Sequence, residues 1–177
     1  KSMQVDINRI NFPRIGNPFG IVLNNSIFPI DSFRHLYRAK EIINLTTDIK
    51  KINFVEIGSG LGGLIVHLIN LNKKTNNRLK IIIYDLPEVL SMSYVLTKSI
   101  FPEKKVYLNR FISNPFNNDF DVLFLPSDKF HLLDNNSADV IYNSCSLSEM
   151  DSKDSNQYIN LINNKCKRYF MHDNLDN

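Results

Sequence analysis

The stretch that decides the fold is residues 53–69, NFVEIGSGLGGLIVHLI. It lies partly in an apolar run (52–57) that stops at Gly58, which is the pattern of a short buried strand. After the glycines, apolar residues return at helical spacing, at Leu61, Leu64, Ile65, Leu68 and Ile69. Glycines in such a turn let the backbone approach a ligand and expose the N–H groups that begin the helix. The stretch therefore predicts a strand, a cofactor-binding glycine turn and a helix.

The glycines of this turn fit two cofactor patterns at once. Gly58, Gly60 and Gly63 form G-x-G-x-x-G, the fingerprint of dinucleotide-binding proteins. A second pattern, E-x-G-x-G-x-G from Glu56 to Gly62, is typical of S-adenosylmethionine-dependent methyltransferases. Glu56 favours the second, because a carboxylate there accepts hydrogen bonds from methionine's ammonium group or its ordered water, and repels a pyrophosphate. The alternative is a strand-end glutamate that faces solvent.

Later residues supply groups for a nucleoside. Asp85 ends the next apolar run, where an acid accepts hydrogen bonds from both ribose hydroxyls, although it can also cap the helix that Pro87 opens. The stretch 125–150 resembles the part of methyltransferases in which a polar pair meets the adenine and the fourth strand ends at the sulfonium. We therefore expect S-adenosyl-L-methionine to bind at Glu56, Gly58, Ser59, Gly60, Gly62, Asp85, Leu86, Ser127, Asp128 and Asn143.

Strand and helix patterns alternate along the rest of the chain. Apolar runs predict further strands at 80–85, 104–108, 121–125, 138–143 and 168–172, and helical spacing predicts helices at 31–45, 87–100 and 152–164. Alternation of this kind predicts an α/β, Rossmann-like sheet of the class I methyltransferase type, mainly parallel and in three layers. Because such sheets usually have seven strands, we expect the last strands to be lacking, either because the core is truncated at its C-terminus or because a partner completes the fold.

The expected organisation is a single domain with an N-terminal extension. Residues 1–50, irregular before Asp31, are expected to cover the cofactor site, and 51–177 to form the methyltransferase core. The stretch RIGNPFG (14–20) is either a loop over the cofactor or a plain surface turn.

Composition narrows the class of protein. The chain has 177 residues, a net charge of +3 and 43% apolar residues, which suits one globular domain and gives no basic footprint for nucleic acid. Cys145 and Cys166 form no C-x-x-C pair or metal-finger spacing, so we expect a cytoplasmic protein without a metal site. No apolar run is long enough to span a membrane, and no membrane partner is expected.

Five stretches together resemble one family. They are IGNPFG (15–20), FRHLYRAKEI (33–42), VEIGSGLGGL (55–64), YDLPEVL (84–90) and NSCSLSEM (143–150). Together they resemble the sugar O-methyltransferase family of the class I methyltransferases, over about residues 14–172. The resemblance implies O-methylation of a hydroxyl on a sugar or sugar-containing small molecule. It also places Cys145 where relatives often carry His.

A hydroxyl acceptor needs a base, and open α/β sheets bind ligands at the carboxyl ends of their strands. The candidates there are Glu149, His172 and Asp173, each with a structural alternative as a cap or loop residue. Arg34, His35 and Tyr37 are expected on the helix before the glycine turn, either as a lid or in ordinary packing. His67 and His131 are expected to be structural.

Two other classes of function stay open from the sequence. An NAD-dependent oxidoreductase would need the turn to hold a pyrophosphate beside Glu56. A domain that keeps the cofactor pocket without catalysis would carry the same motifs.

Overall fold

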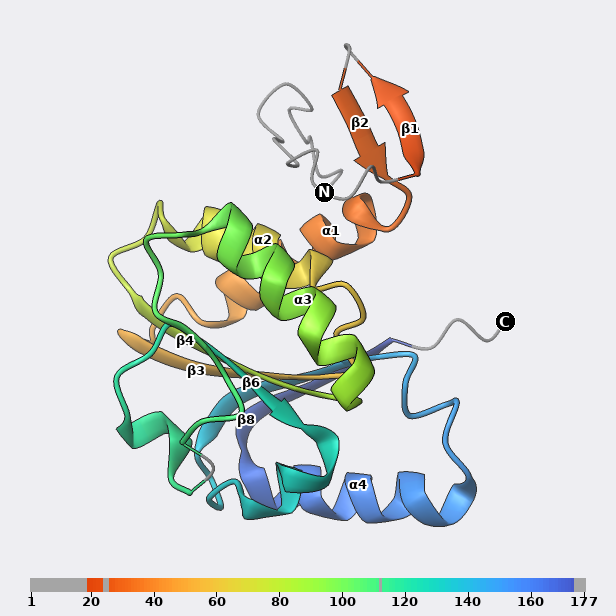
Figure 1. Cartoon of the computed structure of the whole chain (residues 1–177). Coiled ribbons are helices and arrows are strands. Elements are labelled where there is room, and N and C mark those ends of the chain that lie inside the picture. The colour runs from red at the N-terminus through yellow and green to blue at the C-terminus, as the bar shows by residue number, and fades with distance from the viewer. Residues whose placement is uncertain (1–18, 24–25, 112, 174–177) are drawn as a thin grey trace.

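A computed structural model describes residues 19–23, 26–111 and 113–173 (Figure 1). Its centre is a six-stranded sheet whose neighbouring strands are all parallel. The strand order is β5-β6-β4-β3-β7-β8. The bounds are β3 (Lys51–Ile57), β4 (Arg78–Asp85), β5 (Val106–Leu108), β6 (Val122–Pro126), β7 (Ala138–Ser144) and β8 (Cys166–Asp173).

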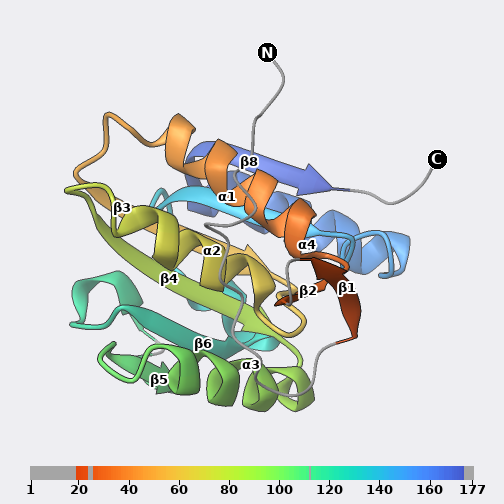
Figure 2. The same ribbon diagram turned by 90° about the horizontal axis from the view of Figure 1, so that it is seen from above.

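Helices cover both faces of the sheet and complete three layers (Figures 1 and 2). One face carries α1 (Ser32–Leu45), α2 (Gly63–Asn72) and α3 (Pro87–Ile100), and the other carries α4 (Ser152–Lys165). Two short 3-10 helices, η2 (Pro115–Asn117) and η3 (Ser127–Leu132), flank β6. The α/β class, the mainly parallel sheet and the three layers expected from the sequence are confirmed. Across the described residues, no helix is both long and apolar enough to cross a membrane.

Alternate residues of each central strand point to opposite faces and build two apolar cores. In β3, Phe54 packs with α1 and α2, whereas Val55 and Ile57 pack on the face of α4. Glu56 shares the parity of Phe54, so its side chain lies on the α1 face. Asp85 does the same, because Ile81 and Ile83 belong to that core.

The strand order reverses at β3. The chain runs from β3 to β4, on to the edge strand β5 and back to β6 beside β4, and then crosses to β7 on the other side of β3. A crevice forms at the carboxyl ends of strands where the order reverses in this way, and such crevices bind ligands in open α/β sheets. The glycine turn after β3 lies at this point.

A hairpin precedes α1, where the sequence was expected to be irregular. Strands β1 (Gly20–Leu23) and β2 (Ser26–Pro29) pair antiparallel. Phe28 is buried and stacks on Phe33 with ring centroids 5.9 Å apart. The sequence does contain a pattern that is typical of a hairpin, because two short apolar runs flank an Asn pair in residues 20–29. Residues 14–18 of RIGNPFG fall outside the described residues.

Candidate active site

The turn between β3 and α2 requires its glycines. Gly58, Gly60 and Gly62 have φ values of 74°, 53° and 78°, which only glycine adopts without strain. A Cβ on Gly58 would lie 2.4 Å from the hydroxyl oxygen of Ser146, so the loop after β7 crosses directly over this residue. The turn is therefore fixed both by its own backbone and by the neighbouring loop.

Gly63, which completes the dinucleotide fingerprint, has a packing role. A Cβ on Gly63 would lie 2.4 Å from Nδ1 of His35, because α1 packs closely against the start of α2. The buried His67 joins the same contact, with its Nε2 3.0 Å from the hydroxyl of Ser32. The third glycine of G-x-G-x-x-G is thus explained by helix packing, without a pyrophosphate.

Glu56 is the most unusual titratable group of the site. Its side chain is 2% exposed, and its Oε2 is buried without a hydrogen-bond partner. Burial, followed by the nearby negative charge of Asp85, raises the pKa of Glu56 to about 8, and Arg34 opposes the shift. The alternative of a strand-end glutamate facing solvent is wrong.

Arg34 of α1 brings a positive charge to the same place. Its guanidinium donates to the hydroxyl of Ser144, at the end of β7, over 2.6 Å. Its Nε is buried and has no hydrogen-bond partner. The site therefore contains one acidic side chain, Glu56, and one cationic side chain, Arg34. Each keeps one hydrogen-bonding atom without a partner. Sequence reasoning placed Arg34 on a possible lid, but gave no sign of its approach to β7.

Glu56 and Arg34 line one cavity of about 980 Å³. The inner part of the cavity is polar and includes Ser59 and Ser144. The outer part is mostly apolar, although the exposed Asp31 and Ser91 also line it, and it is formed by β2 and the segments that flank the β1–β2 hairpin, by the glycine turn and by α3. Its apolar side chains are Phe19, Pro29, Ile30, Leu61, Met92, Val95 and Leu96.

An ion pair holds α1 against the ends of β7 and β8. Arg38 donates to both carboxylate oxygens of Asp173, at 2.8 Å from Nε to Oδ2 and by a second, shorter contact. The Tyr142 hydroxyl donates to Oδ2 over 2.8 Å. Burial raises the pKa of Asp173, but the Arg38 and Tyr142 bonds outweigh it and hold the pKa below its usual range. Because Arg34 lies one turn before Arg38, this ion pair also positions Arg34.

Asp85 braces the glycine turn from the end of β4. Its Oδ2 accepts from the backbone N–H of Gly60 at 3.1 Å and from the Ser59 hydroxyl at 3.4 Å. Its Oδ1 accepts from the N–H of Leu86 at 2.8 Å. Leu86 is the N-cap of α3, without a side-chain cap bond, so Asp85 does not cap the helix in the usual way.

The remaining predicted cofactor residues lie outside the lining of the cavity. Ser127 and Asp128 begin η3 beyond β6, and Asp128 is exposed. The Asn143 side chain is buried and donates to the carbonyl of Ile57 over 2.9 Å. Its oxygen lies 3.1 Å from Nδ1 of His172, so Asn143 ties β7 to both neighbouring strands.

The three predicted catalytic residues are not among the residues that line the cavity. Glu149 and His172 are exposed, and the Asp173 carboxylate is occupied by Arg38. His35 does line the cavity, and burial together with Arg34 lowers its pKa to about 4. A neutral imidazole therefore faces the cavity at neutral pH. Within the described ranges, no three His, Cys, Asp or Glu side chains are grouped to hold a metal ion.

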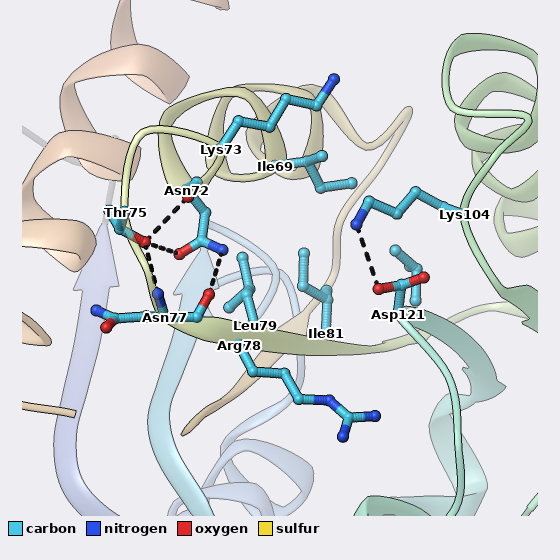
Figure 3. Close-up of a pocket in the computed structure, with 11 residues that line it drawn as sticks. Ile69, Asn72, Lys73, Thr75, Asn77, Arg78, Leu79, Ile81, Lys104 and Asp121 are labelled. Carbon is cyan, nitrogen blue, oxygen red and sulfur yellow. Dashed lines mark hydrogen bonds and ion pairs between the residues drawn. The ribbon is translucent and has the colours of Figure 1, made fainter. Parts of the chain in front are cut away.

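A smaller cavity of about 260 Å³ lies at the opposite end of the sheet (Figure 3). Several of its polar side chains bond within the lining, while Lys73 and Arg78 pair with Glu103 and Asp119 outside it. The Asn72 amide donates to the carbonyl of Asn77 over 3.0 Å, and the Thr75 hydroxyl donates to Asn72. Lys104 pairs with Asp121 at 3.3 Å. This end carries none of the expected site residues.

Comparison with solved structures places the fold among known proteins. A proposed S-adenosyl-L-methionine-dependent methyltransferase from Methanococcus maripaludis is similar with a TM-score of 0.52 and 18% identity, over 80% of this chain and 57% of that chain. An S-adenosylmethionine-dependent methyltransferase from Aquifex aeolicus gives 0.54 and 13%, over 79% and 65%. Magnesium protoporphyrin IX methyltransferase from Synechocystis, with bound S-adenosylhomocysteine, gives 0.52 and 10%, over 78% and 55%.

The chain spans less than two thirds of the length of each of these proteins. No family model and no curated protein matches it. At such low identities, structural likeness establishes the fold alone. The chain has the fold of the class I S-adenosylmethionine-dependent methyltransferases.

Proposed function

We propose that the protein is an S-adenosylmethionine-dependent methyltransferase that acts on a small-molecule acceptor. The observation that carries the proposal is the buried, unpartnered carboxylate oxygen of Glu56, at the polar end of a cavity beside the glycine turn. A buried carboxylate without a partner is costly, so it marks a place where a ligand supplies the missing donor. The cofactor would supply a methyl group on a sulfonium.

The amino-acid end of this cofactor matches the two unused atoms. Glu56 is suited to accept from its ammonium group, and the Nε–H of Arg34 to donate to its carboxylate. The two side chains come from different elements, β3 and α1, so the pair depends on the packing of the helix. The sequence predicts that residues 1–50 cover the cofactor site, and for the described part of that segment, 19–23 and 26–50, this stays our proposal.

The nucleoside end is assigned to residues at the ends of β4 and β6. We propose that Asp85 and Leu86 receive the ribose, and that Ser127 and Asp128 receive the adenine. The bonds that Asp85 accepts from the N–H groups of Gly60 and Leu86 support this, because they fix its carboxylate beside the glycine turn while leaving lone pairs for hydroxyl donors. Gly58 and Asn143 would border the sulfur, because both lie where β3 and β7 end side by side.

The protein's own contribution to transfer is alignment and the exclusion of water. A hydroxyl on a sugar stays the predicted acceptor on the strength of the family resemblance, and Glu149, His172 and Asp173 stay candidates for the base. His35 joins them because it faces the cavity in neutral form. The same fold serves a porphyrin methyltransferase, so the fold does not select a sugar. A cytoplasmic location also stays a prediction, and it is based on the cysteine pattern alone.

Calorimetric titration of the full chain tests the proposal. S-adenosylmethionine and S-adenosylhomocysteine should bind with a stoichiometry near one, and NADH should not bind. The reverse preference would indicate the oxidoreductase alternative. Incubation with methyl-labelled S-adenosylmethionine and an acceptor panel then separates an enzyme, which transfers label, from a cofactor-binding domain, which does not.

A further inference from the structure

The outer part of the large cavity is lined by apolar side chains that are more than half exposed. Phe19 is 87% exposed, and Leu61 and Val95 are 63% and 59% exposed. Ile30 and Met92 are also more than half exposed. All five line the same cavity, although they come from separate segments that precede β1, follow β2, form the glycine turn and belong to α3. Exposed apolar side chains that gather on one concave surface mark a binding site.

This apolar surface is continuous with the polar end that holds Glu56 and Arg34. Their unused atoms match the amino-acid end of the cofactor, which is small and charged. The whole cavity is about 980 Å³, at the upper end of the range of about 300–1,000 Å³ for small-molecule sites. The predicted ribose and adenine residues, Asp85, Leu86, Ser127 and Asp128, do not line it. The apolar part is therefore left for a second molecule.

We infer that the acceptor carries an apolar framework, about the size of an aromatic ring system. This framework packs between Leu61, Val95 and the segments that flank the β1–β2 hairpin at Phe19 and Ile30. The inference rests on the proposed function and names the acceptor class for the same site. Its reactive group points toward the inner, polar part of the cavity. A free sugar or polyol lacks an apolar body and does not match this surface, whereas a phenol or a glycoside with an aromatic substituent does.

Binding to the full chain saturated with S-adenosylhomocysteine tests the inference without relying on turnover. The probes are naphthol and phenyl β-glucoside, set against myo-inositol and methyl β-glucoside, and binding is measured by saturation-transfer NMR. The expected result is that the two aromatic probes bind at least about tenfold more tightly than their polar counterparts, since an aromatic ring buries a large apolar area. Equal or reversed binding overturns the inference.

Two matched variants locate the probe. Val95→Asp lies in the cavity, and Val22→Asp lies on β1, 66% exposed and outside the lining. Both side chains are exposed, so both variants should fold. Val95→Asp should weaken phenyl β-glucoside binding about tenfold and leave the affinity for S-adenosylhomocysteine unchanged, and Val22→Asp should change neither. Loss of S-adenosylhomocysteine affinity in Val95→Asp would place the adenosine there and overturn the inference. Failure of the parent to bind S-adenosylhomocysteine at all would instead refute the proposed function, and the inference with it.

Discussion

The two cavities at opposite ends of the sheet differ in how their polar groups are satisfied. At the amino ends of β4 and β6, Lys104 is paired with Asp121, and Asn72 is bonded to Thr75 and Asn77 (Figure 3). At the carboxyl ends, Glu56 has a buried oxygen without a partner. Polar groups that serve only stability are normally satisfied within the protein. Among the described residues, Tyr84 and Thr97 also have buried hydroxyls without a partner, but only Glu56 and Arg34 bring such atoms to one cavity, which supports the proposal that the carboxyl ends bind the ligand.

The largest effect should come from removing the charge of Glu56. Glu56→Gln keeps the shape but removes the carboxylate that would face the cofactor's ammonium group once Glu56 gives up the proton it holds in the unliganded protein at neutral pH. We expect S-adenosylhomocysteine affinity to fall by about 100-fold, corresponding to about 2.7 kcal/mol for a buried charged hydrogen bond. Calorimetry of the two proteins measures it. An affinity within threefold of the parent would contradict the proposal that the carboxyl ends of the strands, at Glu56, bind the cofactor.

The same residue should make stability depend on pH. Its folded pKa of about 8 exceeds the ordinary value of 4.5, so the folded protein holds a proton that the unfolded chain has lost between these values. The contribution of Glu56 is therefore complete below about pH 4.5 and is lost as pH rises toward 8. Relative to the parent, Glu56→Gln should melt at a higher temperature at pH 8. The expected difference is about 2–4 °C for each kcal/mol of unfolding free energy that the parent loses when Glu56 ionises. Parallel melting profiles from pH 5 to 8 would contradict this.

A smaller effect is expected where α1 is held to the sheet. Asp173→Asn weakens the contacts to Arg38 and Tyr142, and should cost about 1–3 kcal/mol of unfolding free energy. Because Arg34 loses its support, S-adenosylhomocysteine affinity should also fall by about threefold to tenfold. Denaturant unfolding and calorimetry follow the two quantities separately. A purely structural role would lower stability and leave the affinity unchanged.

The smallest effect should come from the amino-end cavity. Lys104→Met breaks its pair with Asp121, and both side chains are about one third exposed. Such pairs contribute about 0–1 kcal/mol, so stability should change little. Cofactor affinity should be the same as in the parent. A tenfold loss of affinity would show that the two ends of the sheet are coupled.

Prediction from the sequence was accurate for features that depend on residues close together in the chain. Strand and helix bounds agreed closely because apolar periodicity marks them, as in α3 at Pro87–Ile100. The glycine turn and the position of Glu56 on β3 also followed from residues close together in the chain. The hairpin β1–β2 was missed because its strands have only four residues each.

The rest of the site depends on contacts between distant residues. The bond between Arg38 and Asp173 joins positions 135 residues apart, and nothing in their local sequence distinguishes a catalytic acid from a structural partner. The burial of Glu56 and the approach of His35 to Gly63 likewise arise from the packing of α1. These features need the three-dimensional arrangement of the helix on the sheet.

The most direct test compares S-adenosylhomocysteine with methylthioadenosine, which keeps the nucleoside and lacks the amino-acid end. If Glu56 and Arg34 hold that end, the parent should bind S-adenosylhomocysteine about 100-fold or more tightly than methylthioadenosine. Arg34→Met should narrow the ratio by about tenfold through weaker binding of S-adenosylhomocysteine alone. Equal affinities of the parent for the two ligands, or an equal loss of both in Arg34→Met, would contradict the account.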